Sequence, residues 1–138
     1  GKKFTSGKLS YELLLPNDWG AVAQGDGFVD FGPGNPKPAA GKIAIDMQCL
    51  YGTQTKIYGE NTEEELKNVT FGNNQYVEKK IYVVNAESRI LSFQNYTIQL
   101  PNSYTGNTCK TASFIVRDYN LEKNIITFIL SSFKIEAR

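Results

Sequence analysis

Histidine is missing from the sequence: none of the 138 residues carries an imidazole. This absence excludes mechanisms in which imidazole acts as a general base, as the partner of a nucleophile or as a zinc ligand, and with them the Ser-His-Asp and Cys-His hydrolases. Cysteine is scarce as well, because Cys49 and Cys109 alone cannot complete a four-thiolate zinc site or an iron–sulfur cluster. We therefore predict no catalytic residue, no metal and no cofactor, and we expect that the protein is not an enzyme.

The sequence also lacks an excess of either charge and any long apolar run. Lys and Arg number 15 against 14 for Asp and Glu, a net charge of +1, without the basic excess that is typical of nucleic-acid-binding proteins. No segment approaches the roughly 18 apolar residues of a membrane-spanning helix. We expect a monomer whose partner is a protein or a small molecule and not a nucleic acid. Membrane contact would need an anchor upstream of Gly1. Because the sequence starts with Gly and not with Met, we expect that a segment upstream of Gly1 has been removed.

The residues that are present favour β-structure in one domain, which we predict to span residues 1–138. Eight Tyr, eight Phe and 12 Gly against one Met favour strands over a helical bundle. Alternating or β-branched and aromatic segments predict strands at residues 9–15, 28–31, 42–50, 76–84, 88–100 and 111–116.

Three details of these strands follow from the pattern. In residues 42–50 the alternation places one set of side chains on a single face, namely Ile43, Ile45, Met47 and Cys49. Residues 85–87 are short enough for a hairpin loop, so the strands on either side are expected to pair antiparallel. The strand at 88–100 has a possible break at Asn95.

Two helices are predicted. Asn61 is a capping residue, and the acidic residues at 63–65 would oppose the positive end of a short helix over residues 61–69. Residues 118–120 would cap a C-terminal helix whose apolar residues recur at helical spacing. These apolar residues are Leu121, Ile125, Ile126, Phe128, Ile129, Leu130 and Phe133. The order of elements predicts an α+β fold with a mainly antiparallel sheet and an amphipathic C-terminal helix that lies flat on it.

Two short motifs resemble the PsbP-like family. Residues 15–19 are Leu-Pro-Asn-Asp-Trp, and residues 129–135 are Ile-Leu-Ser-Ser-Phe-Lys-Ile; family members often open with a strand ending in Pro-x-x-Trp and close with a helix followed by Ser-Phe-Lys. The resemblance implies a single PsbP-like domain over residues 1–138, built as an α/β/α sandwich with a central antiparallel sheet. It also implies a binding or assembly module without a shared active site, as in bacterial secreted proteins and lipoproteins of unknown function. The Pro-rich loop at residues 32–41 departs from the simplest form of the family's pattern.

The two cysteines leave two alternatives open. As a disulfide, Cys49 and Cys109 would close a loop of 60 residues and stabilise the fold by roughly 4 kcal/mol. As free thiols they would be small buried apolar side chains. A disulfide would agree with an extracytoplasmic location, whether secreted, periplasmic or anchored to the cell envelope.

The predicted binding surface lies in loops, because loops on a rigid scaffold commonly carry binding residues. We expect a non-enzymatic, extracytoplasmic module that binds a protein or a small ligand through the turn at 17–20 and the loop at 32–40. The expected contact residues are Asn17, Asp18, Trp19, Pro33, Asn35 and Lys37. For Trp19, closing one end of the core is the alternative role.

Two functions of other classes stay open. A carboxylate-dependent hydrolase without histidine would need a pocket that holds at least two converging acids or a Lys with a shifted pKa. A small-ligand carrier would need the sheet to close into a barrel around a cavity.

Overall fold

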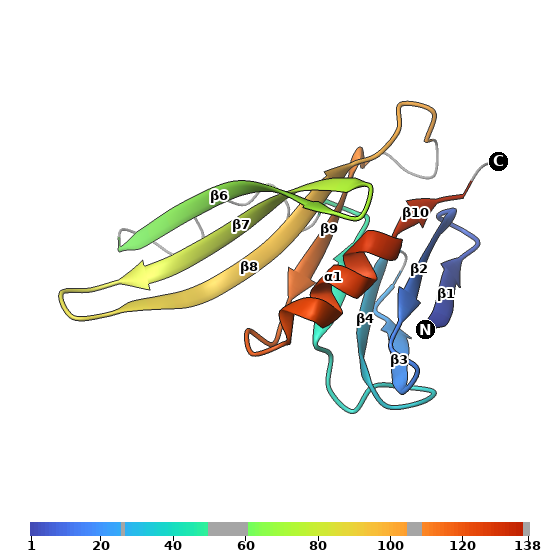
Figure 1. Ribbon diagram of the computed structural model, residues 1–138, viewed down its shortest axis with the longest axis horizontal. Helices are drawn as coiled ribbons and strands as arrows, with labels where there is room; N and C mark the ends of the chain where they lie inside the picture. Colours follow the sequence, from blue (N-terminus) through green and yellow to red (C-terminus); the bar gives the residue numbers. More distant parts are fainter. Residues whose placement is uncertain (26, 50–60, 105–108, 137–138) are drawn as a thin grey trace.

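The computed structural model describes residues 1–25, 27–49, 61–104 and 109–136. These residues form two antiparallel sheets and one helix (Figure 1). The smaller sheet has the order β1-β2-β10, and the larger sheet has the order β3-β4-β5-β9-β8-β7-β6. The elements are β1 (Lys2–Ser6), β2 (Tyr11–Leu15), β3 (Trp19–Ala23), β4 (Phe28–Pro33), β5 (Ile43–Asp46), β6 (Thr62–Phe71), β7 (Asn74–Val84), β8 (Arg89–Gln99), β9 (Thr111–Val116), α1 (Lys123–Ser132) and β10 (Lys134–Ile135).

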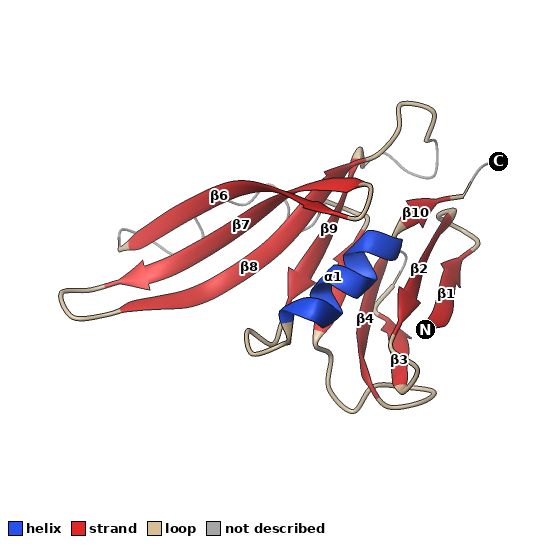
Figure 2. Ribbon diagram, in the orientation of Figure 1, coloured by secondary structure: helices blue, strands red, loops and turns tan. Residues whose placement is uncertain are grey.

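The helix and the smaller sheet pack on the same face of the larger sheet, which we call the inner face (Figure 2). Phe133, directly after α1, joins these layers. Its ring lies 5.3 Å from the ring of Phe114 on β9 and 5.8 Å from the ring of Tyr11 on β2. All three rings belong to the main buried cluster, so the core lies between the inner face and these two covering layers.

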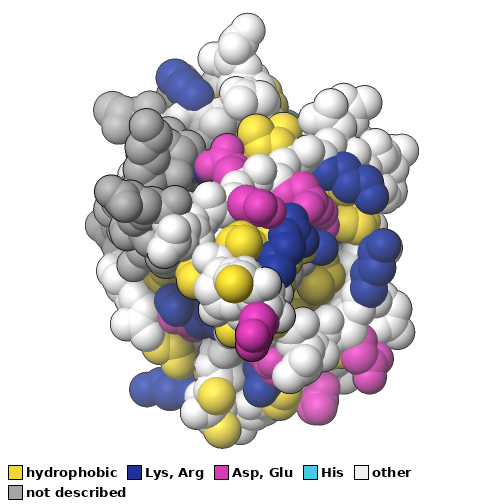
Figure 3. Space-filling view, turned by 90° about the vertical axis from the view of Figure 1, so that its left-hand side faces the viewer, with side chains coloured by type: hydrophobic (Ala, Val, Ile, Leu, Met, Phe, Trp, Pro, Cys, Tyr) yellow, Lys and Arg dark blue, Asp and Glu magenta, His cyan; other side chains and the backbone are white. Residues whose placement is uncertain are grey.

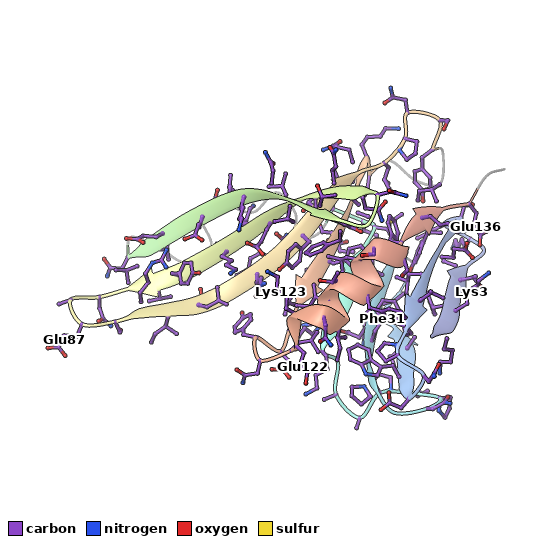
Figure 4. All side chains as sticks on the ribbon, in the orientation of Figure 1. Lys3, Phe31, Glu87, Glu122, Lys123 and Glu136 are labelled. Carbon is purple, nitrogen blue, oxygen red and sulfur yellow. A yellow bond between two sulfur atoms is a disulfide. The ribbon has the colours of Figure 1, made fainter. Side chains whose placement is uncertain are left out.

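The opposite face of the larger sheet, the outer face, has its own buried cluster. Phe28, Ala44, Ile81, Phe93 and Ile115 come from five neighbouring strands of the larger sheet. Strands β6, β7 and β8 continue past the helix and form the long end of the molecule in Figure 1. Glu87 marks the far end of the β7–β8 hairpin, and Glu122 and Lys123 mark the start of α1 (Figure 4).

The structure confirms the mainly antiparallel, sheet-rich fold. Strands lie in each of the six predicted segments, and β7 and β8 pair antiparallel on either side of the predicted hairpin loop. Ile43, Ile45 and Met47 are buried together in the main cluster, as the alternation predicts. Leu50, at the end of the predicted strand, lies outside the described residues.

The predicted helix at residues 61–69 is wrong, because this segment is the long strand β6. It pairs with β7 over its whole length, from Thr62 opposite Val83 to Phe71 opposite Asn74. Gly72, with a φ of 61°, begins the two-residue turn that joins the strands. Pairing along ten residues outweighs the weak helix preference of three glutamates, because strand formation depends on partners distant in sequence.

Two further details of the prediction are wrong. β8 runs through Asn95 without a break, and the register shift lies instead opposite Ile81 and Tyr82. Asp118 does not cap the C-terminal helix; its carboxylate accepts a hydrogen bond from the Asn120 N–H at 3.0 Å, and the helix starts only at Lys123. An Asp side chain bonds readily to the backbone two residues on, which favours a local turn over a helix start.

The amphipathic C-terminal helix is confirmed. Ile126, Ile129 and Leu130 of α1 are buried, whereas Phe128 is 38% exposed. The α/β/α sandwich is not confirmed, since α1 is the one helix among the described residues. Within the same residues no helix has the length and apolar character to span a membrane.

Candidate functional site: a groove on the outer face

A groove with a volume of about 930 Å³ lies on the outer face of β6, β7 and β8. Its floor follows from the strand register, because residues directly opposite each other in an antiparallel pair lie on the same face. Two adjacent rows cross the three strands: Leu66, Lys79 and Asn95, and then Asn68, Val77 and Thr97. The groove is therefore formed by regular strands, which hold their side chains in fixed positions.

The described lining of this groove is rich in uncharged polar side chains. Amides and hydroxyls come from Asn68, Asn73, Gln75, Asn95, Gln99, Thr70 and Thr97. Lys79 is the one charged residue among the described lining residues, which include no carboxylate. Leu66, 58% exposed, and Val77 add small apolar surfaces. Such a lining suits a ligand with many hydrogen-bonding groups and little charge.

Asn95 stands out in this floor. Its side chain is fully buried, at 0% exposure, yet neither Nδ2 nor Oδ1 has a hydrogen-bond partner. Leaving buried polar groups unpaired costs about 1–3 kcal/mol each, so most native buried amides are paired. An unpaired amide at this place is therefore the strongest sign of a ligand site in the described part of the chain, and a ligand would bond to it only after the side chain becomes accessible from the groove.

The surroundings of Asn95 are tightly held. On the outer face, the hydroxyls of Thr97 and Ser113 lie 3.0 Å apart and bond β8 to β9. On the inner face, the Tyr96 hydroxyl donates to the Glu78 carboxylate at 2.7 Å and accepts from the Gln94 amide at 2.9 Å. Burial, followed by the contact with Glu78, raises the pKa of Tyr96, so this phenol stays protonated. Both faces of β8 are thus fixed around the groove.

An ion-pair cluster on the inner face holds the far ends of the same strands together. Arg89 on β8 lies 3.6 Å above the ring of Tyr82 on β7 and reaches the carboxylates of Glu63 and Glu65 on β6, each at 3.0 Å. The pKa of Arg89 is raised by Glu65 and then Glu63. From the far ends of the strands, acidic and basic side chains are seen side by side (Figure 3). The cluster explains why the acidic run is compatible with a strand.

The two loops predicted to bind lie together but away from the groove. The Gly34 N–H donates to the Asp18 carbonyl at 2.8 Å, and Gly20 is so close to the second loop that a Cβ there would lie 2.3 Å from the Gly34 carbonyl oxygen. They flank β3 and β4, at the opposite edge of the larger sheet from β6. A role of these loops in binding stays a prediction.

The predicted contact residues in these loops differ in exposure. Trp19 is 3% exposed and belongs to the main cluster, in agreement with its alternative role of closing the core. The others are exposed: Asn17, Asp18, Pro33, Asn35 and Lys37.

Cys49 and Cys109 form a disulfide, which confirms the first of the two alternatives for them. Their Cα atoms are 5.8 Å apart. The bond links the segment after β5 to the segment before β9, two neighbouring strands at the centre of the larger sheet.

The described carboxylates provide no support for a hydrolase. Glu12 lies between Lys134 at 2.8 Å and Lys3 at 3.2 Å, and Asp30 is paired with Arg117. In residues 1–25, 27–49, 61–104 and 109–136, no group of three or more acids and cysteines is placed to hold a metal ion. The small-ligand carrier is equally unsupported, because the described strands β3 and β6 do not pair to close a barrel.

Sequence reasoning missed the groove because it assigned β6 to a helix. The available signal was Gly72-Asn73 between two segments that can form strands, a pair typical of a two-residue hairpin turn. That signal predicts the three-stranded surface. It does not predict the burial of Asn95, which depends on the packing of the outer face.

Comparison with known proteins is informative about the fold alone. No protein-family model matches the chain, and no curated protein matches it. A protein of known crystal structure from Bacteroides thetaiotaomicron VPI-5482 is similar over 100% of this chain, with a TM-score of 0.55 and 14% sequence identity. This chain spans about half of that protein, 49% of its length.

Proposed function

We propose that this protein is a non-enzymatic, extracytoplasmic binding module whose ligand is a neutral oligosaccharide held in the outer-face groove. The observation that carries the proposal is the buried, unpaired amide of Asn95 in the groove lining. The groove replaces the two predicted loops as the preferred binding surface.

The chemistry of the lining selects the ligand class. An amide offers two donor hydrogens and an acceptor oxygen, and a sugar hydroxyl can meet both. An apolar ligand would leave Asn95 and its neighbouring amides unpaired and would therefore bind poorly. A strongly charged ligand would find Lys79 as its single charged contact among the described lining residues. The C–H surfaces of a sugar ring can pack on the exposed Leu66 and Val77.

The disulfide supports the proposed location. Disulfides persist in oxidising compartments and are rare in the cytosol, and Cys49–Cys109 is part of this fold. Membership of the PsbP-like family and the α/β/α sandwich that it implies stay predictions, as does a role in assembly with another protein.

The proposal is tested by titrating the ¹⁵N-labelled protein with neutral oligosaccharides of glucose and of N-acetylglucosamine. We expect the side-chain amide signals of Asn95 and Gln99 to shift, and we expect Asn95→Val to abolish binding. Asn35→Ala, which removes an amide from the predicted loop, is the matched control and should leave binding unchanged. Shifts confined to residues 17–20 and 32–40 would instead favour the loops, and binding of only charged or apolar probes would contradict the ligand class.

A further inference from the structure

We propose that the outer edge of β6 pairs with the same edge of a second copy of this chain, antiparallel and centred on Leu66. The inference is independent of the proposed ligand and departs from the expectation of a monomer. It concerns the open backbone edge of β6 and shares only Leu66 and Asn68 with the groove. The partner follows from the backbone pattern and the order of charges along β6.

The backbone of β6 is oriented for such pairing. β6 is the last strand in the order of the larger sheet, and it is the outermost strand at the long end of the molecule in Figure 1. The Asn61 carbonyl accepts from the Val84 N–H on the β7 side at 2.8 Å. Hydrogen-bonding groups alternate between the two sides of a strand. The N–H and C=O groups of Glu64, Leu66 and Asn68 therefore point away from β7, toward the open edge.

The side chains of β6 are self-complementary about Leu66. In an antiparallel pair centred there, Glu65 lies opposite the second copy's Lys67, and Lys67 lies opposite the second copy's Glu65. The two Leu66 side chains meet on the outer face, where each is now 58% exposed. Lys67 forms no ion pair with any described residue, so its ammonium group is available for the second copy. Opposite charges and apolar side chains facing each other both stabilise strand pairs.

This register is favoured over its neighbours. Moving the centre by one residue places Glu65 opposite the second copy's Glu65, or Lys67 opposite the second copy's Lys67. Like charges directly opposite each other destabilise a strand pair. The acidic run that ends at Glu65 therefore does not prevent pairing. It disfavours the neighbouring registers, in which like charges face each other, and leaves the register centred on Leu66. The result is a closed two-fold dimer in which each copy presents the same surface.

The test is a charge exchange followed by sedimentation equilibrium of the full chain. Glu65→Lys and Lys67→Glu each create two like-charge pairs, so we expect each variant to dimerise at least about tenfold more weakly than the wild type. An equimolar mixture of the two variants should recover dimers, because each Lys then faces a Glu of the other variant. The double variant Glu65→Lys/Lys67→Glu should dimerise like the wild type. Lys2→Glu, on β1 in the smaller sheet, is the control: it makes the same charge change as Lys67→Glu at a position away from β6.

Several outcomes would overturn the inference. A wild-type protein that stays monomeric at millimolar concentration excludes the dimer. Single variants that dimerise as tightly as the wild type exclude this edge, and a mixture that fails to recover dimers excludes this register. Circular dichroism of each variant checks folding; Arg89 retains Glu63 as a partner when Glu65 is replaced, so the local strand pairing should survive.

Discussion

The hydroxyl of Tyr76 on β7 donates a hydrogen bond to the main-chain carbonyl of Leu130, in the last turn of α1, at 2.6 Å. The side-chain amide of Asn74 donates to the same carbonyl at 2.9 Å and to that of Phe133 at 2.8 Å. The last turn of the helix contains no basic residue. The helix end, whose final carbonyls have no partners within the helix, is therefore capped by a strand more than fifty residues away in sequence.

We expect Tyr76→Phe to lower the free energy of unfolding by about 1 kcal/mol, and Asn74→Ala by a similar or larger amount. The double variant should lose more than the sum, because only then does the Leu130 carbonyl lose both donors. Urea unfolding of the four proteins measures this coupling. Tyr82→Phe, which removes a hydroxyl that bonds no described residue, should be neutral. Strict additivity would contradict the shared cap.

We expect Asn95→Val to raise the free energy of unfolding by about 1–2 kcal/mol, because it replaces a buried amide without partners by an apolar side chain suited to a strand. Thermal and urea unfolding measure the change. Thr97→Val is the matched comparison on the same strand: its hydroxyl is bonded to Ser113, so its removal should destabilise the protein. A loss of stability in Asn95→Val would show that the amide has partners after all.

Removing the disulfide should lower the free energy of unfolding by about 4 kcal/mol, because the bond closes a loop of 60 residues in the unfolded chain. Urea unfolding of Cys49→Ser/Cys109→Ser against the oxidised wild type measures the loss. The wild type in reductant should match the double variant, and the double variant itself should not respond to reductant. Equal stability of the oxidised and reduced wild type would contradict a structural role for the bond.

Stability should fall in acid partly through Glu12. Its pKa is lowered, first by Lys134 and then by Lys3, so ionised Glu12 stabilises the folded state. This contribution is complete above the ordinary pKa of 4.5 and is lost as pH falls through the lowered folded-state pKa. Glu12→Gln should therefore flatten the decline of stability below that pH. Glu64→Gln, which removes a carboxylate without an ion pair to any described residue, should keep the wild-type profile; equal profiles for both variants would contradict the assignment.

Local pattern predicted the parts of the fold that depend on neighbours in sequence. Ile43, Ile45 and Met47 alternate and are buried together, and Ile126, Ile129 and Leu130 of α1 recur at helical spacing and face the core. Local pattern gave a wrong prediction for β6. Glu63 and Glu65 favour the start of a helix when they are considered alone, whereas in the structure Arg89 pairs with both of them on neighbouring strands. The candidate site shows the same limit of local pattern. The loops at residues 17–20 and 32–40 can be identified from their composition, whereas the groove depends on the packing of β6, β7 and β8.

The sequence by itself determined the exclusion of imidazole chemistry, the near-neutral charge and the preference for strands, because these depend on composition and short-range periodicity alone. The choice between a disulfide and free thiols was left to the tertiary structure, which brings Cys49 and Cys109 together. Tertiary structure also decided the pairing of β6, the cap on α1 and the burial of Asn95 without a partner. The disulfide and the cap on α1 join segments more than fifty residues apart in the chain. β6 is held as a strand by pairing with β7 along its whole length and by Arg89 of β8, and these contacts do not follow from the residues of β6 alone.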